Sequence, residues 1–322
     1  MTRATTLARL AFAGALAFFG ACPPGLAQNT RVVVPGPPGG FADIAVRLTT
    51  ERLQQSLGNP VVIEHRPGAG GTVGLEFLRN ARADGATVGM INLSAAANES
   101  LVKGKSFSLL ADFEPIGQYA WLANVLIVNP ALPADSIPAL IEYLKKQAQA
   151  SYASGGIGSP GHLTGELFKA RTGLAMTHVP YKGAPPAVTA VVAGEVALMF
   201  ATASSAIGQI RGGKLRALAV TTAERLQQLA DVPTLAQAGF GDINVTDWVG
   251  LVAPKGTPPE ARDKLHRAFL AAFSDAEAQE RLRNATIVPA AKPLGPAEFG
   301  AFLKSEIDKW GKVVREANIS QN

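Results

Sequence analysis

The sequence predicts an α/β protein built from two lobes. Short runs rich in valine and isoleucine alternate with amphipathic helical patterns, which is typical of strand–helix–strand units in a mainly parallel sheet. The alternation begins twice, at Val32 and again at Val125. Each half also carries a glycine-rich turn between a strand and a helix, at Pro35–Gly40 and Gly155–Gly161. We therefore expect two lobes, each with a glycine loop at the carboxyl end of a strand.

The first half predicts three strands and two helices. An apolar stripe at helical spacing, from Ile44 to Leu57, predicts a helix over 42–57. The turn His65–Gly71 leads into a second helix near 73–79. The expected strands are Val32–Val34, Val61–Ile63 and Thr87–Leu93. Ser94 and Ala95 follow the last of these strands directly.

The second half repeats this plan. Helices are expected over 137–149 and 163–171. The expected strands are Val125–Pro130, Ser151–Ala153, Thr177–Pro180, Val196–Phe200 and Leu215–Val220. Trp248–Pro254 mirrors the apolar strand at Val125, and we interpret these two runs as crossover strands between the lobes. Lobe 1 is then residues 28–124 and 252–322, and lobe 2 is residues 125–251.

The C-terminal part is expected to be helical and to return to lobe 1. Apolar residues recur there at helical spacing: Phe299, Phe302, Leu303, Ile307, Trp310 and Val314. Such a stripe is typical of a helix packed on a core.

The N-terminus predicts a secretory signal peptide over residues 1–27. Two arginines precede the apolar run Leu10–Phe19, and small residues occupy the cleavage positions at Gly25–Ala27. The run is too short for a membrane span. The single cysteine, Cys22, lies in this leader, and the residues before it match a lipoprotein cleavage site poorly, so we do not expect acylation. The mature chain then has neither disulfides nor a thiol nucleophile.

Charge argues against a nucleic-acid partner. The whole chain carries a formal net charge of +5, and its lysines and arginines form no conspicuous cluster. A nucleic-acid footprint would be concentrated. A mild, scattered positive excess is compatible with steering small acids toward a cleft.

A nucleotide site is excluded by what the glycine loops lack. Gly156–Gly161 fits G-x-G-x-x-G after a strand, but a dinucleotide site needs an acidic residue about 20 positions later. The corresponding segment, Met176–Lys182, contains no acid. No Gly-Lys-Ser/Thr follows either loop, so a P-loop is excluded as well.

Enzyme and metal sites find no support either. The residues two positions before and two positions after Ser159 are Ile157 and Gly161. A G-x-S-x-G nucleophile elbow needs glycine at both positions, so it is absent. His162 and Glu166 lie one helical turn apart, but no further ligand at metal spacing accompanies them. We expect no catalytic residue, no metal and no cofactor.

A small carboxylate suits the loops better. Free backbone N–H groups and the positive end of a helix dipole attract an anion. The hydroxyls of Ser94, Ser154 and Ser159 lie beside these loops. The alternative is that the glycines serve tight turns alone. Because such loops occur at strand ends in both lobes, we favour a binding cleft between the lobes.

These motifs resemble the Bug-type solute-binding proteins of tripartite tricarboxylate transporters. The resemblance covers nearly the whole mature chain and the order of its motifs, each of which is weak alone. The matching segments are Pro35–Asp43, Glu64–Gly71, Tyr152–Ser159 with His162 and Leu163, His178–Gly183, and Asp231–Thr234.

The resemblance implies a periplasmic, two-lobed binding protein that closes on a small organic acid, a di- or tricarboxylate or an aromatic carboxylate. It implies delivery to membrane permease subunits by a protein expected to be a monomer. By position it implies ligand contacts at Gly39, Gly40, Phe41, Asp43, Ser94, Ala95, Ser154, Ser159, His162, Tyr181 and Lys182. A sensor that presents the liganded form to a two-component membrane kinase would use the same fold and remains the alternative.

Two positions depart from the family pattern. Gly36 replaces the usual phenylalanine, which removes an apolar wall and predicts a larger pocket. Thr202 follows Ala201 where an acid often stands, so a partner for a ligand amine is missing. Both changes favour a bulkier, amine-free acid.

Three side chains keep two interpretations at this stage. Asp43 is either a ligand contact or a charge that stabilises the first turn of its helix. His162 faces the cleft or the surface, and we favour the cleft. Trp248 either packs at a hinge or lines the cleft.

Overall fold

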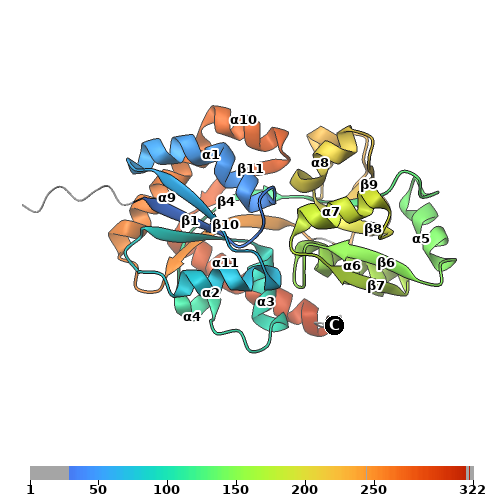
Figure 1. The fold of residues 1–322 in the computed structure, drawn as a ribbon, viewed down its shortest axis with the longest axis horizontal. Helices are drawn as coiled ribbons and strands as arrows, with labels where there is room; N and C mark the ends of the chain where they lie inside the picture. The colour runs from blue at the N-terminus through green and yellow to red at the C-terminus, as the bar shows by residue number, and fades with distance from the viewer. Residues whose placement is uncertain (1–28, 244, 317–318, 320–322) are drawn as a thin grey trace, which may run out of the picture.

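The computed structural model describes residues 29–243, 245–316 and 319. The predicted signal peptide and Cys22 lie outside the described residues. The described chain forms two α/β lobes, each built on its own sheet (Figure 1). The predicted two-lobed α/β architecture is confirmed.

The first lobe holds a six-stranded sheet in the order β11-β4-β10-β3-β1-β2. Its strands are β1 (Thr30–Val34), β2 (Val61–His65), β3 (Thr87–Ile91), β4 (Phe113–Leu122), β10 (Asp247–Pro254) and β11 (Ile287–Leu294). One face packs against α1 (Phe41–Leu57), α9 (Pro259–Ser274) and α10 (Ala276–Asn284). The other face packs against α2 (Thr72–Arg79), α3 (Leu93–Leu101) and α11 (Pro296–Glu316). The short helices η1 (Ala69–Gly71) and α4 (Leu109–Asp112) lie in its connections.

The second lobe holds a five-stranded sheet in the order β7-β6-β8-β5-β9. Its strands are β5 (Asn124–Val128), β6 (Ala150–Ser154), β7 (Met176–Pro180), β8 (Leu198–Thr202) and β9 (Arg216–Val220). Helices α5 (Ile137–Lys145) and α6 (Pro160–Thr172) cover one face. Helices α7 (Ala184–Ala193) and α8 (Ala203–Arg211) cover the other, and the short helix η2 (Gln227–Leu229) precedes the return to lobe 1.

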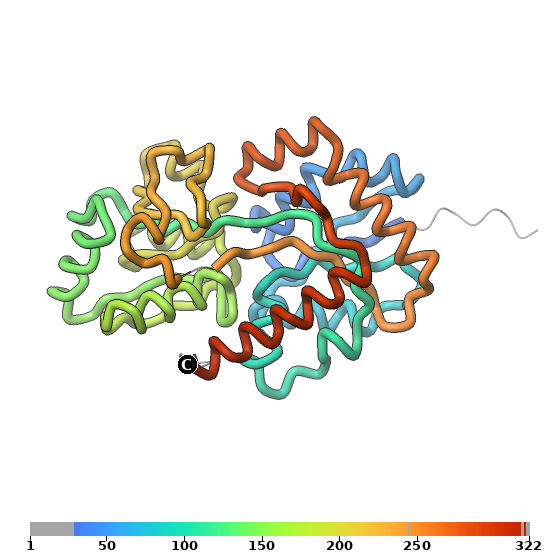
Figure 2. The backbone as a smooth tube through the Cα atoms, turned by 180° about the vertical axis from the view of Figure 1, so that it is seen from behind, coloured from blue at the N-terminus to red at the C-terminus, as the bar shows by residue number. Residues whose placement is uncertain are grey.

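Strand direction identifies where the chain crosses between the lobes. β5 runs antiparallel to both of its neighbours, and so does β10, whereas β1, β2 and β3 run parallel, as do β6, β7 and β8. β4 ends at Leu122, and β5 begins at Asn124. The returning chain enters β10 at Asp247, which pairs with Leu122. The two passages therefore run side by side between the lobes (Figure 2).

The strand bounds correct one part of the sequence interpretation. β10 pairs with β4 from Asp247 to Pro254, so residues 247–251 belong to the first sheet, and the predicted boundary at 252 falls inside a strand. β5 lies wholly in the second sheet. The crossovers are the short connections beside these strands. An unbroken apolar run could not reveal this, because the strand is buried along its whole length.

The C-terminal helix α11 fastens the returning passage. The predicted core role of its apolar stripe is confirmed: Phe299, Leu303, Trp310 and Val314 are buried, with Phe302 and Ile307 packed against the same core. Trp248 of β10 is fully buried, with ring centroids 5.7 Å from Phe299 and 5.4 Å from Phe302.

A buried carboxylate adds a polar contact to this packing. Glu306 Oε2 accepts hydrogen bonds from the indole N–H groups of Trp248 (3.0 Å) and Trp310 (3.1 Å). Trp248 therefore packs against α11 at the start of β10, and it is not among the residues that line the cavity described below.

The contact between β10 and α11 gives a stability prediction. A Cβ at Gly250 would overlap the Phe299 ring, so Gly250→Ala should destabilise the protein by about 1–3 kcal/mol through overpacking. Gly208 lies inside α8 with open space around it, so Gly208→Ala should stabilise by roughly 0.5–1 kcal/mol. Guanidinium unfolding of both variants measures the difference, and equal stability would contradict the packing described.

Candidate functional site

A cavity of about 290 Å³ lies between the lobes, at the carboxyl edges of both sheets. Lobe 1 contributes residues 34–37, 40–42, 67–71, 75, 91, 92, 94 and 95. Lobe 2 contributes residues 124, 155–157, 159–161, 180–184, 199, 200 and 202. Much of this lining is apolar or consists of glycine and proline, so the walls offer shape and backbone groups more than charged side chains.

N-cap and first-turn residues of several helices line this cavity. They belong to α1 at Gly40–Ala42, α2 at Gly71, α6 at Pro160 and Gly161, α7 at Gly183 and Ala184, and α8 at Thr202. Helices α1, α2, α7 and α8 begin without a side-chain cap. Uncapped first turns leave backbone N–H groups without intrahelical partners and carry the positive end of the helix dipole.

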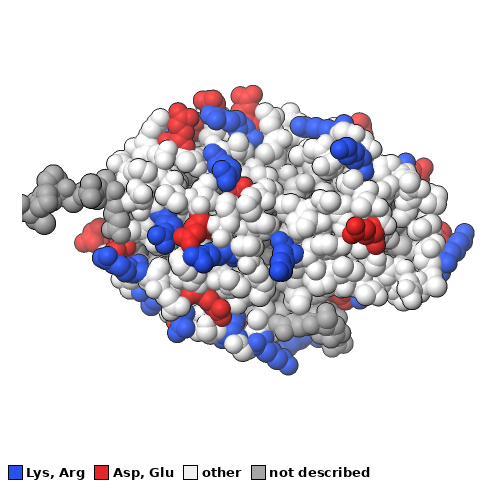
Figure 3. Space-filling model, in the orientation of Figure 1, with Lys and Arg blue, Asp and Glu red and all other residues white. Residues whose placement is uncertain are grey.

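Charge in the cavity has one sign. Among the described lining residues, Lys182 is the charged side chain, and it lies exposed at the rim. The same lining contains no Asp or Glu. On the outer face drawn in Figure 3, by contrast, Lys and Arg are interspersed with Asp and Glu. The cavity is therefore suited to an anion.

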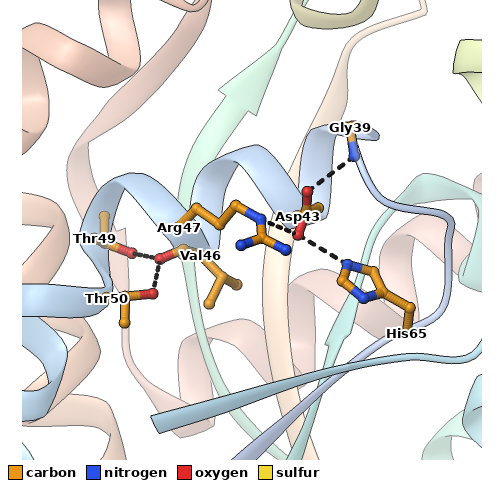
Figure 4. Close-up of polar contacts among 7 residues, drawn as sticks. All are labelled: Gly39, Asp43, Val46, Arg47, Thr49, Thr50 and His65. Carbon is orange, nitrogen blue, oxygen red and sulfur yellow. Dashed lines mark hydrogen bonds and ion pairs between the residues drawn. The ribbon is translucent and has the colours of Figure 1, made fainter.

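Asp43 closes the first glycine loop on itself (Figure 4). Its carboxylate accepts hydrogen bonds from the Gly39 N–H (2.9 Å) and from Arg47 Nε (2.7 Å), and it lies 2.8 Å from His65 Nε2. Burial alone would raise the pKa of Asp43, but these partners outweigh burial and lower it. Neither Asp43 nor Gly39 lines the cavity. The ligand contacts predicted at Gly39 and Asp43 remain predictions: in the described structure the polar groups of these two residues bond each other behind the loop.

The second glycine loop is held in the same way from beneath. Ser154 Oγ accepts from the Gly156 N–H (3.1 Å) and lies 2.6 Å from His178 Nε2. His162 Nδ1 accepts from the Gly158 N–H (3.1 Å). The two imidazole rings stack with centroids 4.1 Å apart.

The structure places Ser154 and His162, two further predicted ligand contacts, beneath the second glycine loop. Both are buried and neither lines the cavity. Ser154 Oγ and His162 Nδ1 each accept a hydrogen bond from the backbone of their own loop, and a ligand contact of either remains a prediction.

Glycines let the two lobes meet around the cavity. Gly70 and Gly158 have φ of +62° and +72°; a Cβ on Gly70 would overlap the Ile157 carbonyl oxygen of lobe 2, and a Cβ on Gly158 would overlap the Asn98 side chain of lobe 1. A Cβ on Gly183 would overlap Pro37 of the opposite lobe. In the described structure the two lobes therefore approach each other closely at these glycines.

An acidic side chain of the protein itself meets the start of helix α3. Asp247, fully buried at the start of β10, accepts from the Leu93 N–H (3.0 Å), the Trp248 N–H (2.8 Å) and Asn92 Nδ2 (2.9 Å). Burial raises the pKa of Asp247 to about 7. This built-in carboxylate fixes the first turn of α3 and so positions Ser94 and Ala95 at the cavity wall.

Most of the predicted site residues do line the cavity. They are Gly36, Gly40, Phe41, Ser94, Ala95, Ser159, Tyr181, Lys182 and Thr202. Sequence reasoning missed the turn Pro67–Gly71, although it follows a strand in the same way as the other two loops. It also missed Asn92 and Asn124, of which Asn124 opens an apolar strand and gave no signal beyond its polarity.

The described residues form no group of three or more His, Cys, Asp or Glu side chains placed to hold a metal ion. In the described part of the chain, no helix combines the length and apolar character that crossing a bilayer requires.

Comparison with known proteins identifies the family of this chain. Residues 45–319 match the model of the tripartite tricarboxylate transporter family receptor. The chain belongs to this family. Protein BugT of Bordetella pertussis is 35% identical over 293 residues, which cover 90% of this chain and 89% of BugT. The resemblance to Bug-type solute-binding proteins is therefore confirmed.

Two solved relatives carry a small acid. Rpa4515 of R. palustris, solved with adipate, is 32% identical with a TM-score of 0.86 and covers 91% of this chain and 98% of its own. MatC of Rhodopseudomonas palustris, with bound malate, is 29% identical with a TM-score of 0.84 and covers 89% and 99%. This family and fold are those of transport binding proteins.

The stacked histidines give a pH prediction. Burial lowers the pKa of His162 to about 4, and burial with the neighbouring His162 lowers the pKa of His178 to about 3. In the unfolded chain both pKa values lie near 6.5. As pH falls below about 6.5, the unfolded state binds two protons that the native state does not. The contribution of each of these two histidines to stability therefore falls by about 1.4 kcal/mol per pH unit, while the raised pKa of Asp247 acts in the opposite direction over the same range.

Unfolding free energies between about pH 7.5 and 5 test this dependence. His178→Phe keeps a ring in the stack and removes one titrating group, so its stability should fall less steeply with acid than that of the unsubstituted protein. An unchanged slope would show that these histidines do not control it.

Proposed function

We propose that this protein captures a small organic carboxylate between its lobes and delivers it to the membrane permease of a tripartite tricarboxylate transporter. One observation carries the proposal: uncapped helix N-termini from both lobes surround one cavity that Lys182 borders and no described acidic residue lines. Such ends are anion sites. We place this function in the periplasm, after removal of residues 1–27.

The geometry of α3 supports a carboxylate in particular. Where Asp247 meets the first turn of α3, two of its three donors come from that helix end, one backbone N–H and the amide of its N-cap residue. The first turns of α1 and α7 present comparable backbone groups to the cavity without such a partner from the protein's own side chains. Relatives in the family that were solved with adipate and malate agree with this assignment.

Calorimetric titration of the purified protein with a panel of aliphatic and aromatic carboxylates tests the proposal. At least one acid should bind, and an acid present at about 100 times its dissociation constant should stabilise the protein by roughly 2.7 kcal/mol. Failure of every carboxylate to bind would refute it. Uptake by membrane vesicles that contain the permease, with and without this protein, tests delivery separately.

Lys182 gives a prediction for the charge at the rim. Lys182→Met should weaken binding of a carboxylate three- to tenfold, about 0.7–1.4 kcal/mol, because it removes the cation nearest the ligand. The loss should shrink as salt is raised. Lys214→Met is the matched control, since Lys214 is exposed in the same lobe outside the cavity. An equal effect of both substitutions would contradict a specific role for Lys182.

Gly36 gives a prediction for ligand size. Gly36 lines the cavity, and a Cβ there would meet nothing within 4 Å, so the wall has room for a side chain. Gly36→Phe should fill that space and reduce affinity for aromatic acids at least tenfold while leaving short aliphatic acids less affected. Titration of the variant with benzoate-sized and C4 acids measures the shift. A uniform loss for both classes would argue against a size-setting role.

A further inference from the structure

Asn124 is a cavity residue whose side chain the fold does not use. It opens β5 at the first passage between the lobes and is fully buried. Its backbone N–H donates to Thr221 Oγ1 (3.2 Å), and its carbonyl accepts from the Thr221 N–H (2.9 Å). Neither atom of its side-chain amide has a hydrogen-bond partner among the described residues.

The second asparagine of the cavity shows the contrast. Asn92 Nδ2 donates to Asp247, and Asn92 Oδ1 accepts from the Ser94 N–H (3.2 Å). That amide is committed to holding α3. Leaving both polar atoms of a buried amide unpaired costs about 1–3 kcal/mol for each group. The native fold accepts this cost at Asn124, a residue that lines the cavity.

The hydrogen-bonding groups of the Asn124 side-chain amide determine which ligand group can pair with it. A side-chain amide presents a donor and an acceptor side by side. The matching group must therefore offer an acceptor next to a donor, as adenine does to asparagine in DNA recognition. A simple carboxylate offers acceptors alone and leaves Oδ1 unpaired. An α-hydroxy acid offers a carboxylate oxygen to Nδ2 and a hydroxyl hydrogen to Oδ1.

An α-amino acid would also supply a donor, but the cavity disfavours its ammonium group. The described lining residues include no carboxylate to balance a positive charge. Lys182 at the rim and the surrounding helix N-termini both repel a cation. A neutral hydroxyl makes the same hydrogen bond without that repulsion.

We propose that Asn124 is a specificity residue and that the preferred ligands are α-hydroxy carboxylates. This inference rests on the carboxylate-binding function proposed above. In the β5–β8 pair Asn124 lies opposite Thr202, which also lines the cavity, so the polar end of the ligand is expected at this edge of the second sheet.

Two series of acids with matched carbon skeletons test the proposal by calorimetry. One is malate, succinate and aspartate, and the other is mandelate, phenylacetate and phenylglycine. In a series that binds, the hydroxy acid should bind at least tenfold more tightly than both partners. Asn124→Leu should remove that preference and leave the affinity for the unsubstituted acid within about threefold.

Asn129→Leu is the matched control, because Asn129 follows the far end of β5, lies outside the cavity and donates to the Val192 carbonyl. It should keep the preference. A crystal structure of the unsubstituted protein with the hydroxy acid gives a reading that needs no variant, with the ligand hydroxyl expected within hydrogen-bond distance of Asn124 Oδ1.

Several results would overturn the inference. Equal affinity for hydroxy and unsubstituted acids in every series that binds would do so. So would a folded Asn124→Leu variant that keeps the preference or loses all acids alike, or a ligand hydroxyl bound elsewhere. Absence of binding by every carboxylate is a different result, because it would refute the proposed function itself.

Discussion

Two short chain passages, side by side, hold the carboxyl edges of both sheets toward each other, and the site depends on this constraint. The first passage places Asn124 directly after Leu122 and Ala123, and the second places Asp247 opposite Leu122. Because strands in each sheet that lead into helices end at these edges, the helices that follow begin there too. Convergence of helix N-termini on one cavity is thus a consequence of topology.

The described residues that line the cavity include no arginine, so an anion would depend largely on the backbone N–H groups of the loops. Each loop is fastened from behind by a side chain that was a plausible ligand contact in the sequence: Asp43 for the first loop, and Ser154 with His162 for the second. Fixing the loops keeps their backbone N–H groups oriented before a ligand arrives, which lowers the entropic cost of binding. Glycines at the points where the two lobes touch let both loops approach closely.

Sequence patterns predicted the larger features well, because strand and helix periodicity and turn chemistry are local. α1, α6 and α11 and most strands lie where their patterns indicate. β4 was missed because Glu114, Pro115 and Gln118 interrupt its apolar character, although the strand is largely buried. The hydrogen bonds of Asp43, Ser154 and His162 to the backbone of their own loops were not predicted, because position in a motif does not reveal which way a side chain points. Asn124 was missed because a sequence does not show that its side-chain amide lacks a hydrogen-bond partner among the described residues.

Backbone groups and side chains contribute differently to the choice of ligand. N–H groups at helix ends respond to a carboxylate whatever chain it carries, so they cannot separate one acid from another. Discrimination must come from positions where this chain adds or withholds a side chain. Gly36 withholds one and leaves space in the wall, while Asn124 adds an amide whose two polar atoms have no partner among the described residues. In the function that we propose, the first position limits the size of the acid and the second selects the group on the carbon next to its carboxylate. Neither position contributes to the contacts that fasten the loops, so ligand preference can change at both without rebuilding the fold.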